Sequence, residues 1–128
     1  MKYQIFNEEG YAINDMVATV HESCKAAGWY TDLKTGEPLV RNVPEMLALI
    51  HSEVSEALEG YRKNLMDDHL AHRKMVEVEL ADVFIRVADL AGYLDLDLGG
   101  AVIEKFAYNQ SRADHKLENR KKPGGKSI

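Results

Sequence analysis

Two pairs of carboxylates are the residues of this chain whose types and spacing best fit chemistry. Glu53 stands three residues before Glu56, and Glu79 stands three residues before Asp82. Three residues turn a helix by roughly 300° at ~3.6 residues per turn, so both side chains of a pair leave the same face. Two such helices packed side by side would gather four carboxylates.

These carboxylates lie in apolar surroundings, where an unpaired charge is costly. On a helical wheel Glu53 falls inside the apolar arc, and the charged residues between 78 and 94 share a narrow arc: Glu79, Asp82, Arg86 and Asp89. Like charges ~4 Å apart repel by roughly 4 kcal/mol at an effective dielectric constant of 20. A hard divalent cation would relieve that repulsion, and all-oxygen ligation suits Mg²⁺, with Mn²⁺ as a possible substitute.

A basic stripe further along the chain complements the acids. Lys105, Asn109, Arg112 and Lys116 recur at intervals of 4, 3 and 4, so they share one helix face. Lysine as a point charge and arginine as a fork are common ligands of phosphate oxygens. The alternative is an exposed basic face near a helix C-terminus, where cations are favoured. For the acids, the corresponding alternative is a solvated face paired with Arg86 and Arg62.

The elements that must position these residues are predicted to be helices, giving an all-α, four-helix-bundle-like fold. Apolar spacing predicts helices over about 10–27, 44–64, 67–94 and 95–116. Gly28 should end the first helix, and Pro44 suits the first position of the second, after Asn42 or Val43. The caps expected for the third and fourth helices are Asp67 or Asp68 and Asp95 or Asp97.

The remaining segments are predicted to be irregular. Residues 1–10 form a lead-in, 28–43 a loop with a turn at 34–36, and 118–128 a flexible polar tail. The second helix is expected to bury its apolar residues: Leu47, Ile50, Val54, Ala57, Leu58 and Tyr61.

Composition indicates one globular domain over 1–128, with a core at about 11–117. The chain has 128 residues, 45% of them hydrophobic and 29% charged. A net charge of −5 argues against general nucleic-acid binding, which needs a positive surface. No apolar run approaches the ~20 residues of a membrane span, and the N-terminus has no apolar signal core. Cys24 is the one cysteine, which favours a reducing compartment, and we expect a cytoplasmic protein.

Together these motifs resemble the MazG-like all-α nucleoside triphosphate pyrophosphohydrolases, in particular the small single-domain members of bacteria and phages. The similarity rests on Glu53-x-x-Glu56, a gap of 22 residues, and Glu79-x-x-Asp82. It extends to the flanking sequences, ALIHSEVSEALE and ELADVFIR, and to Lys105-x-x-x-Asn109-x-x-Arg112. Gly28-Trp29 before the second helix also fits the small members.

The resemblance implies hydrolysis of a ribo- or deoxyribonucleoside triphosphate to the monophosphate and pyrophosphate. The four acids, Glu53, Glu56, Glu79 and Asp82, would hold Mg²⁺, and Glu53 or Glu56 would orient or deprotonate the attacking water. The triphosphate would be steadied by Lys105, Asn109 and Arg112, and Lys126 in the Gly-Gly-Lys tail could close over it. Trp29 is the candidate for stacking on the base, although packing is an equally valid interpretation. His21 and His51 lack metal-ligand spacing and are interpreted as structural.

The resemblance also implies a homodimer or homotetramer with sites built partly across subunits. The sequence agrees, because the third helix is apolar nearly all round outside its charged stripe.

Two rival functions are distinguishable. A di-iron carboxylate bundle requires Glu-x-x-His pairs, and none occurs at these acids. A non-catalytic metal- or nucleotide-binding protein, or a helical interaction protein, is the other alternative. An interaction protein leaves the stripe at 105–112 unexplained.

Overall fold

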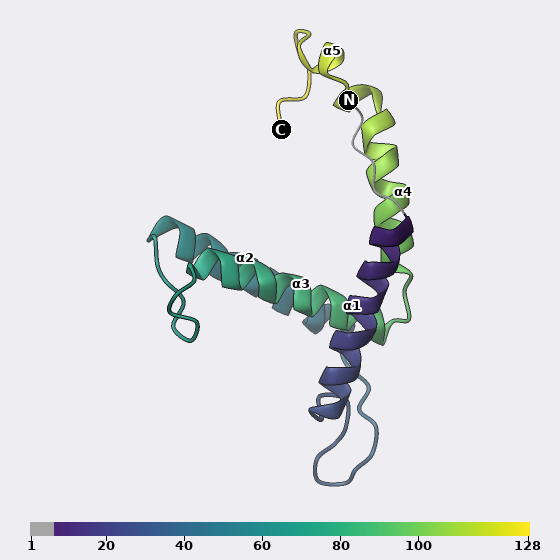
Figure 1. Cartoon of the computed structure of the whole chain (residues 1–128), viewed down its shortest axis with the longest axis vertical. Helices are drawn as coiled ribbons and strands as arrows, with labels where there is room; N and C mark the ends of the chain where they lie inside the picture. Colours follow the sequence, from purple (N-terminus) through teal and green to yellow (C-terminus); the bar gives the residue numbers. More distant parts are fainter. Residues whose placement is uncertain (1–6) are drawn as a thin grey trace. The chain divides into compact units, whose positions relative to one another are not determined.

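The computed structural model describes residues 7–128, and the described chain is all-helical (Figure 1), which confirms the predicted class. Its elements are α1 (Asn7–Ala26), α2 (Val43–Arg62), α3 (Met75–Tyr93), α4 (Leu98–Ser111), the 3-10 turn η1 (Ala113–His115) and α5 (Leu117–Arg120). Within the described range the β-type pairings are two isolated bridges, Thr31 with Pro38 and Met66 with Lys74. None of the described helices is long and apolar enough to cross a membrane. The lead-in predicted over 1–10 lies outside the described residues for its first six positions.

Local side chains set several helix ends as predicted. The Asn42 Oδ1 accepts the backbone N–H of Glu45 at 3.0 Å, and Pro44 follows in the first turn of α2. Asp97 caps α4 in the same way, its Oδ1 accepting the N–H of Gly100 at 2.9 Å. Both contacts satisfy N–H groups that have no partner inside the helix.

Other predicted boundaries were wrong. α1 begins at Asn7, three residues earlier than expected, and α3 begins at Met75 instead of near 67. Asp67 caps a loop turn: its Oδ2 accepts the N–H groups of His69 and Leu70 at 2.9 and 2.7 Å. Aspartate competes well for nearby backbone donors, which favours a turn over a helix there. α4 ends at Ser111 because the backbone of the next residue is extended.

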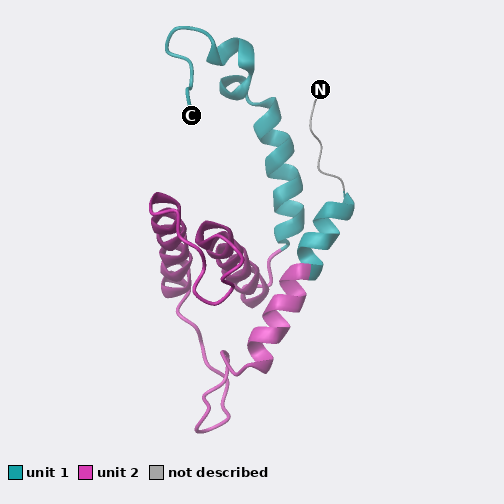
Figure 2. Cartoon of the chain, turned by 60° about the vertical axis from the view of Figure 1, so that its left-hand side comes forward, with its two compact units in different colours: residues 1–15, 97–128 teal, residues 16–96 magenta. Residues whose placement is uncertain are grey.

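The chain divides into two compact units (Figure 2). Among the described residues, unit 1 comprises 7–15 together with 97–128, and unit 2 comprises 16–96. In unit 1, Asn14 joins the first half of α1 to the start of α4. Its Nδ2 donates to Asp97 at 2.8 Å, and its Oδ1 accepts the N–H of Gly99 at 2.8 Å.

Unit 2 contains α2 and α3 side by side (Figure 1), with a small apolar core at one end. Tyr30, Met46 and Leu90 form its centre, and half-buried apolar side chains surround them: Cys24, Val43, Ile50 and Tyr93. The core therefore draws on α1, on the loop after it and on both long helices, so it ties that loop to the helix pair.

The buried face of α2 differs from the predicted one. The buried residues are Met46, Glu53, Ala57 and Gly60, and Ile50 is half-buried. Of the larger residues expected inside, four are exposed: Leu47, Val54, Leu58 and Tyr61. Because residues spaced by three or four share a face, small side chains at 57 and 60 let α2 turn toward α3 and take Glu53 inward.

Gly92 allows α1 and α3 to approach closely, which gives a test of unit 2. A Cβ built at Gly92 would lie 2.4 Å from Cβ of His21. Gly92→Ala should therefore lower the free energy of unfolding by about 1–3 kcal/mol through overpacking, although alanine is the better helix former. Urea denaturation measures this, with the exposed Ser55→Ala as control. A stabilised Gly92→Ala would contradict the close approach.

Candidate functional site

α2 and α3 bring three of the four predicted acids together. Carboxylate oxygens of Glu53, Glu56 and Glu79 all lie within 4.8 Å of one another. Glu53 is buried, with 7% of its surface exposed, whereas Glu79 is half-buried and Glu56 exposed. The Glu-x-x-Glu spacing supplies two of the oxygens from one helix, and the packing of α3 supplies the third. The trio therefore has a buried floor and an open side.

Asp82, the fourth predicted acid, is not part of this trio. It lies on α3 one turn after Glu79 and lines the same hollow as Glu53. Burial raises the pKa of its carboxyl, and the negative charge of Glu53 raises it further. Its place is thus beside the trio, at the edge of the hollow.

Arg86 compensates the buried charge of Glu53. The Arg86 Nε donates to Glu53 Oε1 at 2.6 Å, from α3 to α2. Burial by itself would raise the pKa of the Glu53 carboxyl, but hydrogen bonds from Arg86, Glu56 and Glu79 outweigh it, and the net pKa is lowered. Glu53 is therefore the member of the trio that stays ionised most readily.

The two other glutamates take the opposite shift. Burial is the largest cause of the raised pKa of Glu79, about 7, followed by its hydrogen bond to Glu53 and the neighbouring negative charges. The hydrogen bond and charge of Glu53 also raise the pKa of Glu56. Carboxylates this close share protons because they repel one another when all are ionised, and a divalent cation removes that repulsion.

A hollow of about 430 Å³ opens beside the trio, entirely within unit 2. Its polar walls are Glu53, Asp82, Arg86, Asp89 and Arg41, and Cys24, Trp29, Leu49 and Ile85 complete it. Trp29 is 63% exposed, so its ring stays available at the wall of the hollow. The hollow thus combines carboxylates, guanidinium groups and an aromatic face.

Sequence inspection missed the role of Asp89, which organises the far side of the hollow. Its Oδ1 lies 2.9 Å from Nδ1 of His21, and its Oδ2 accepts the Tyr30 hydroxyl at 2.8 Å. Burial, followed by that hydrogen bond, raises the pKa of the Tyr30 hydroxyl well above its usual range. The one signal of this role in the sequence was the spacing of 79, 82, 86 and 89 by three, four and three residues. That spacing grouped Asp89 with the acids predicted to bind a metal.

Arg41 was also missed, and it is held in place by three contacts. Its Nη1 donates to the carbonyl oxygen of Trp29 at 3.1 Å, and its guanidinium carbon lies 5.4 Å from the ring centre of Tyr30. Its backbone N–H donates to the hydroxyl of Tyr93 at 3.0 Å. These contacts fix the end of the 28–43 loop against α3.

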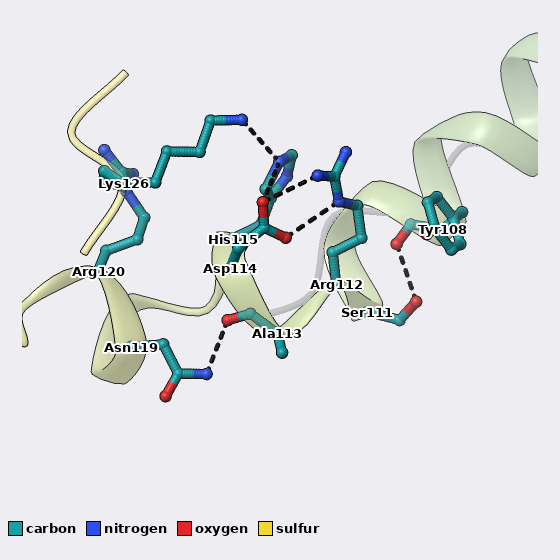
Figure 3. A network of polar contacts seen from close by, with 9 residues as sticks. All are labelled: Tyr108, Ser111, Arg112, Ala113, Asp114, His115, Asn119, Arg120 and Lys126. Carbon is teal, nitrogen blue, oxygen red and sulfur yellow. Dashed lines mark hydrogen bonds and ion pairs between the residues drawn. The ribbon is translucent and has the colours of Figure 1, made fainter. Parts of the chain in front are cut away.

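The predicted phosphate-binding residues belong to unit 1. Lys105 and Asn109 line a hollow of about 330 Å³ on α4, together with Ala101, Val102 and Phe106. The Oδ1 of Asn109 is buried and has no hydrogen-bond partner among the described residues. A buried acceptor without a partner is costly, so a donor such as a sugar hydroxyl would suit this position. Arg112 follows α4 and pairs with Asp114 through two bonds of 3.0 and 2.8 Å (Figure 3).

Lys126 lies in a folded C-terminal segment (Figure 3). Its Nζ lies 3.3 Å from Nε2 of His115, and Arg120 donates to the carbonyl oxygens of residues 126 and 127 at 2.9 and 2.6 Å. The short helix α5 begins one residue before the tail predicted over 118–128 and covers its first three residues. The structure therefore gathers the carboxylates in one unit and the predicted phosphate ligands in the other.

The donor chemistry of the trio fits a hard cation. The trio offers oxygen atoms only, which suits Mg²⁺ or Mn²⁺ and disfavours softer metals. Comparisons with protein-family models, with curated proteins and with solved structures found no match to this chain.

The raised pKa of Glu79 gives a test in metal-free buffer. Between its ordinary value of 4.5 and about 7, the folded protein holds a proton that the unfolded chain has lost. The free energy of unfolding in EDTA should therefore fall as pH rises through this window. Glu79→Gln should flatten that dependence, as measured by urea denaturation at pH 5 and 8. An unchanged pH dependence in Glu79→Gln would show that another group is responsible.

Proposed function

We propose that this chain is a Mg²⁺-dependent nucleoside triphosphate pyrophosphohydrolase of the MazG-like type. It would convert a ribo- or deoxyribonucleoside triphosphate into the monophosphate and pyrophosphate. The observation that carries the proposal is the trio: a buried carboxylate, Glu53, gathered with Glu56 and Glu79 at the side of a hollow. A carboxylate that is buried beside other carboxylates is costly unless a cation compensates the negative charge.

Each acid has a role in this proposal. Glu53, Glu56, Glu79 and Asp82 would hold Mg²⁺, which would supply Lewis-acid polarisation of the α-phosphate and neutralise the leaving pyrophosphate. Glu53 or Glu56 orients the attacking water or takes its proton. The water oxygen bonds to the α-phosphorus while the bond from that phosphorus to the bridging oxygen breaks. The lowered pKa of Glu53 keeps that carboxylate ionised at neutral pH, as a metal ligand requires.

The rest of the substrate meets residues of different chemistry. Trp29 offers an exposed ring to the base at the wall of the hollow. In unit 1, Lys105, Asn109, Arg112 and Lys126 are the residues proposed for the triphosphate or the sugar. The buried oxygen of Asn109, which has no partner among residues 7–128, supports a ligand at that position. The protein would work in the cytoplasm, where Mg²⁺ and nucleotides are abundant.

A homo-oligomer of four-helix protomers, dimeric or tetrameric, completes the proposal. The exposed apolar side chains of α2 fall at intervals of seven, four and three, so they form one stripe: Leu47, Val54, Leu58 and Tyr61. Leu80 and Phe84 are exposed four residues apart on α3. Apolar stripes of this kind usually meet a partner surface.

The reaction is tested by incubating the protein with each of the eight common nucleoside triphosphates, with Mg²⁺ or with EDTA. Ion-exchange chromatography should resolve monophosphate and pyrophosphate, formed only with Mg²⁺. Diphosphate and orthophosphate would mean that a different bond is cleaved. No product, together with no thermal stabilisation by Mg²⁺, would favour the helical interaction protein.

Glu53→Gln should abolish turnover and leave the fold intact, because it removes the ligand charge and little volume. Rates measured under the same conditions should fall by at least about 10²-fold, while far-ultraviolet circular dichroism is unchanged. Glu59→Gln is the matched control on α2, since Glu59 pairs with Lys63 and Arg62 instead of joining the trio. A fully active Glu53→Gln would rule out this metal site.

A further inference from the structure

Arg86 is the cation of unit 2 closest to the acidic trio, through its bond to Glu53, and its terminal nitrogens are uncommitted. The Nε is used by Glu53, but Nη1 and Nη2 make no hydrogen bond or ion pair with any other residue in 7–128. The side chain lines the hollow and is 41% exposed. Two parallel N–H donors in a fixed fork match two oxygens of one phosphate group.

Asp82, one turn before Arg86 on α3, also lines the hollow and lies within the electrostatic influence of Arg86. The two side chains make no hydrogen bond or ion pair with each other, since Arg86 pairs with Glu53. Asp89 already accepts from the Tyr30 hydroxyl and contacts His21, so both of its oxygens are engaged. Arg41 is committed to the Trp29 carbonyl and to the Tyr30 ring. Among the described residues of the hollow, Arg86 is therefore the arginine that contacts the trio and keeps Nη1 and Nη2 available for a ligand.

Charge explains why such a donor is needed. The hollow is lined by three carboxylates, from Glu53, Asp82 and Asp89, and by two guanidinium groups. A polyphosphate would be repelled by this excess of negative charge. One divalent cation in the trio offsets most of this negative charge, and a cationic fork beside it then gives the anion a direct contact.

We propose that Arg86 binds a phosphate group of the substrate through Nη1 and Nη2 while its Nε holds Glu53 in place. Arg86 is thereby both a substrate-binding residue and a positioning residue for the metal site. This inference rests on the proposed function. It adds a phosphate-binding residue within unit 2, because the sequence had indicated only an ion-pair role for Arg86.

The test separates phosphate binding from metal binding by calorimetry on the full chain. The first titration adds Mn²⁺ alone, and the second adds inorganic tripolyphosphate at saturating free Mn²⁺. In Arg86→Lys we expect tripolyphosphate affinity to fall about 10-fold or more, because lysine keeps the charge but loses the fork. Mn²⁺ affinity should stay within about threefold, since a cation still faces Glu53.

Arg73→Lys is the matched control, because Arg73 also pairs with a glutamate at 2.6 Å but lies outside the hollow. It should leave both titrations unchanged. Equal tripolyphosphate affinity in Arg86→Lys and the unsubstituted protein would overturn the inference and leave the proposed function standing. A loss of Mn²⁺ affinity as large as the loss of tripolyphosphate affinity would also overturn the phosphate-binding role, because Arg86 would then act on the carboxylates alone. An unsubstituted protein that binds no Mn²⁺ would overturn the proposed function itself.

A measurement on the unsubstituted protein covers the case in which Arg86→Lys does not fold. Nitrogen-15 spectra of the guanidinium groups should show the Arg86 Nη signals shifting when tripolyphosphate is added with Mn²⁺. The Arg73 signals should stay in place. Unshifted Arg86 signals in a sample that binds tripolyphosphate would overturn the inference.

Discussion

The buried carboxylate of Glu53 is the constraint on which the rest of the candidate site depends. A charge placed between two helices must be compensated, because water no longer solvates it. Arg86 provides part of that compensation from α3 at 2.6 Å. Glu56 and Glu79 add negative charge instead, and the result is a trio whose members hold protons unequally. This imbalance is the physical reason to look for a cation there.

The acids that look alike in sequence have separate roles in the structure. Glu79 and Asp82 are one turn apart on α3, but only Glu79 reaches the trio. Asp89, two turns beyond Asp82, is withdrawn from metal chemistry because it holds His21 and Tyr30. The acids of one stripe on α3 thus divide into a member of the trio, a residue at the edge of the hollow and an anchor for His21 and Tyr30. These acids differ in role because different neighbouring segments supply hydrogen-bond donors to each of them.

The network around Asp89 connects the site to the loop that precedes α2. Tyr30 donates its hydroxyl to Asp89, and the guanidinium group of Arg41 lies over its ring. The same residue packs in the core with Met46 and Leu90. Trp29 is the next residue along and stands at the wall of the hollow. The same contacts that stabilise unit 2 therefore position the aromatic face that a base would meet.

The sequence by itself determined the features that depend on neighbours within one helical turn. It predicted the all-α class and the shared face of each acid pair, and it narrowed two helix starts to Asn42 or Val43 and to Asp95 or Asp97, because spacing and local hydrogen bonds govern these features. The burial of Glu53 was also predictable from its apolar surroundings. Only the tertiary structure decided which face of α2 packs on α3, that Arg86 meets Glu53, and that Asp89 meets His21. These contacts join residues far apart in the chain, and they depend on how each helix is rotated about its axis when side chains pack.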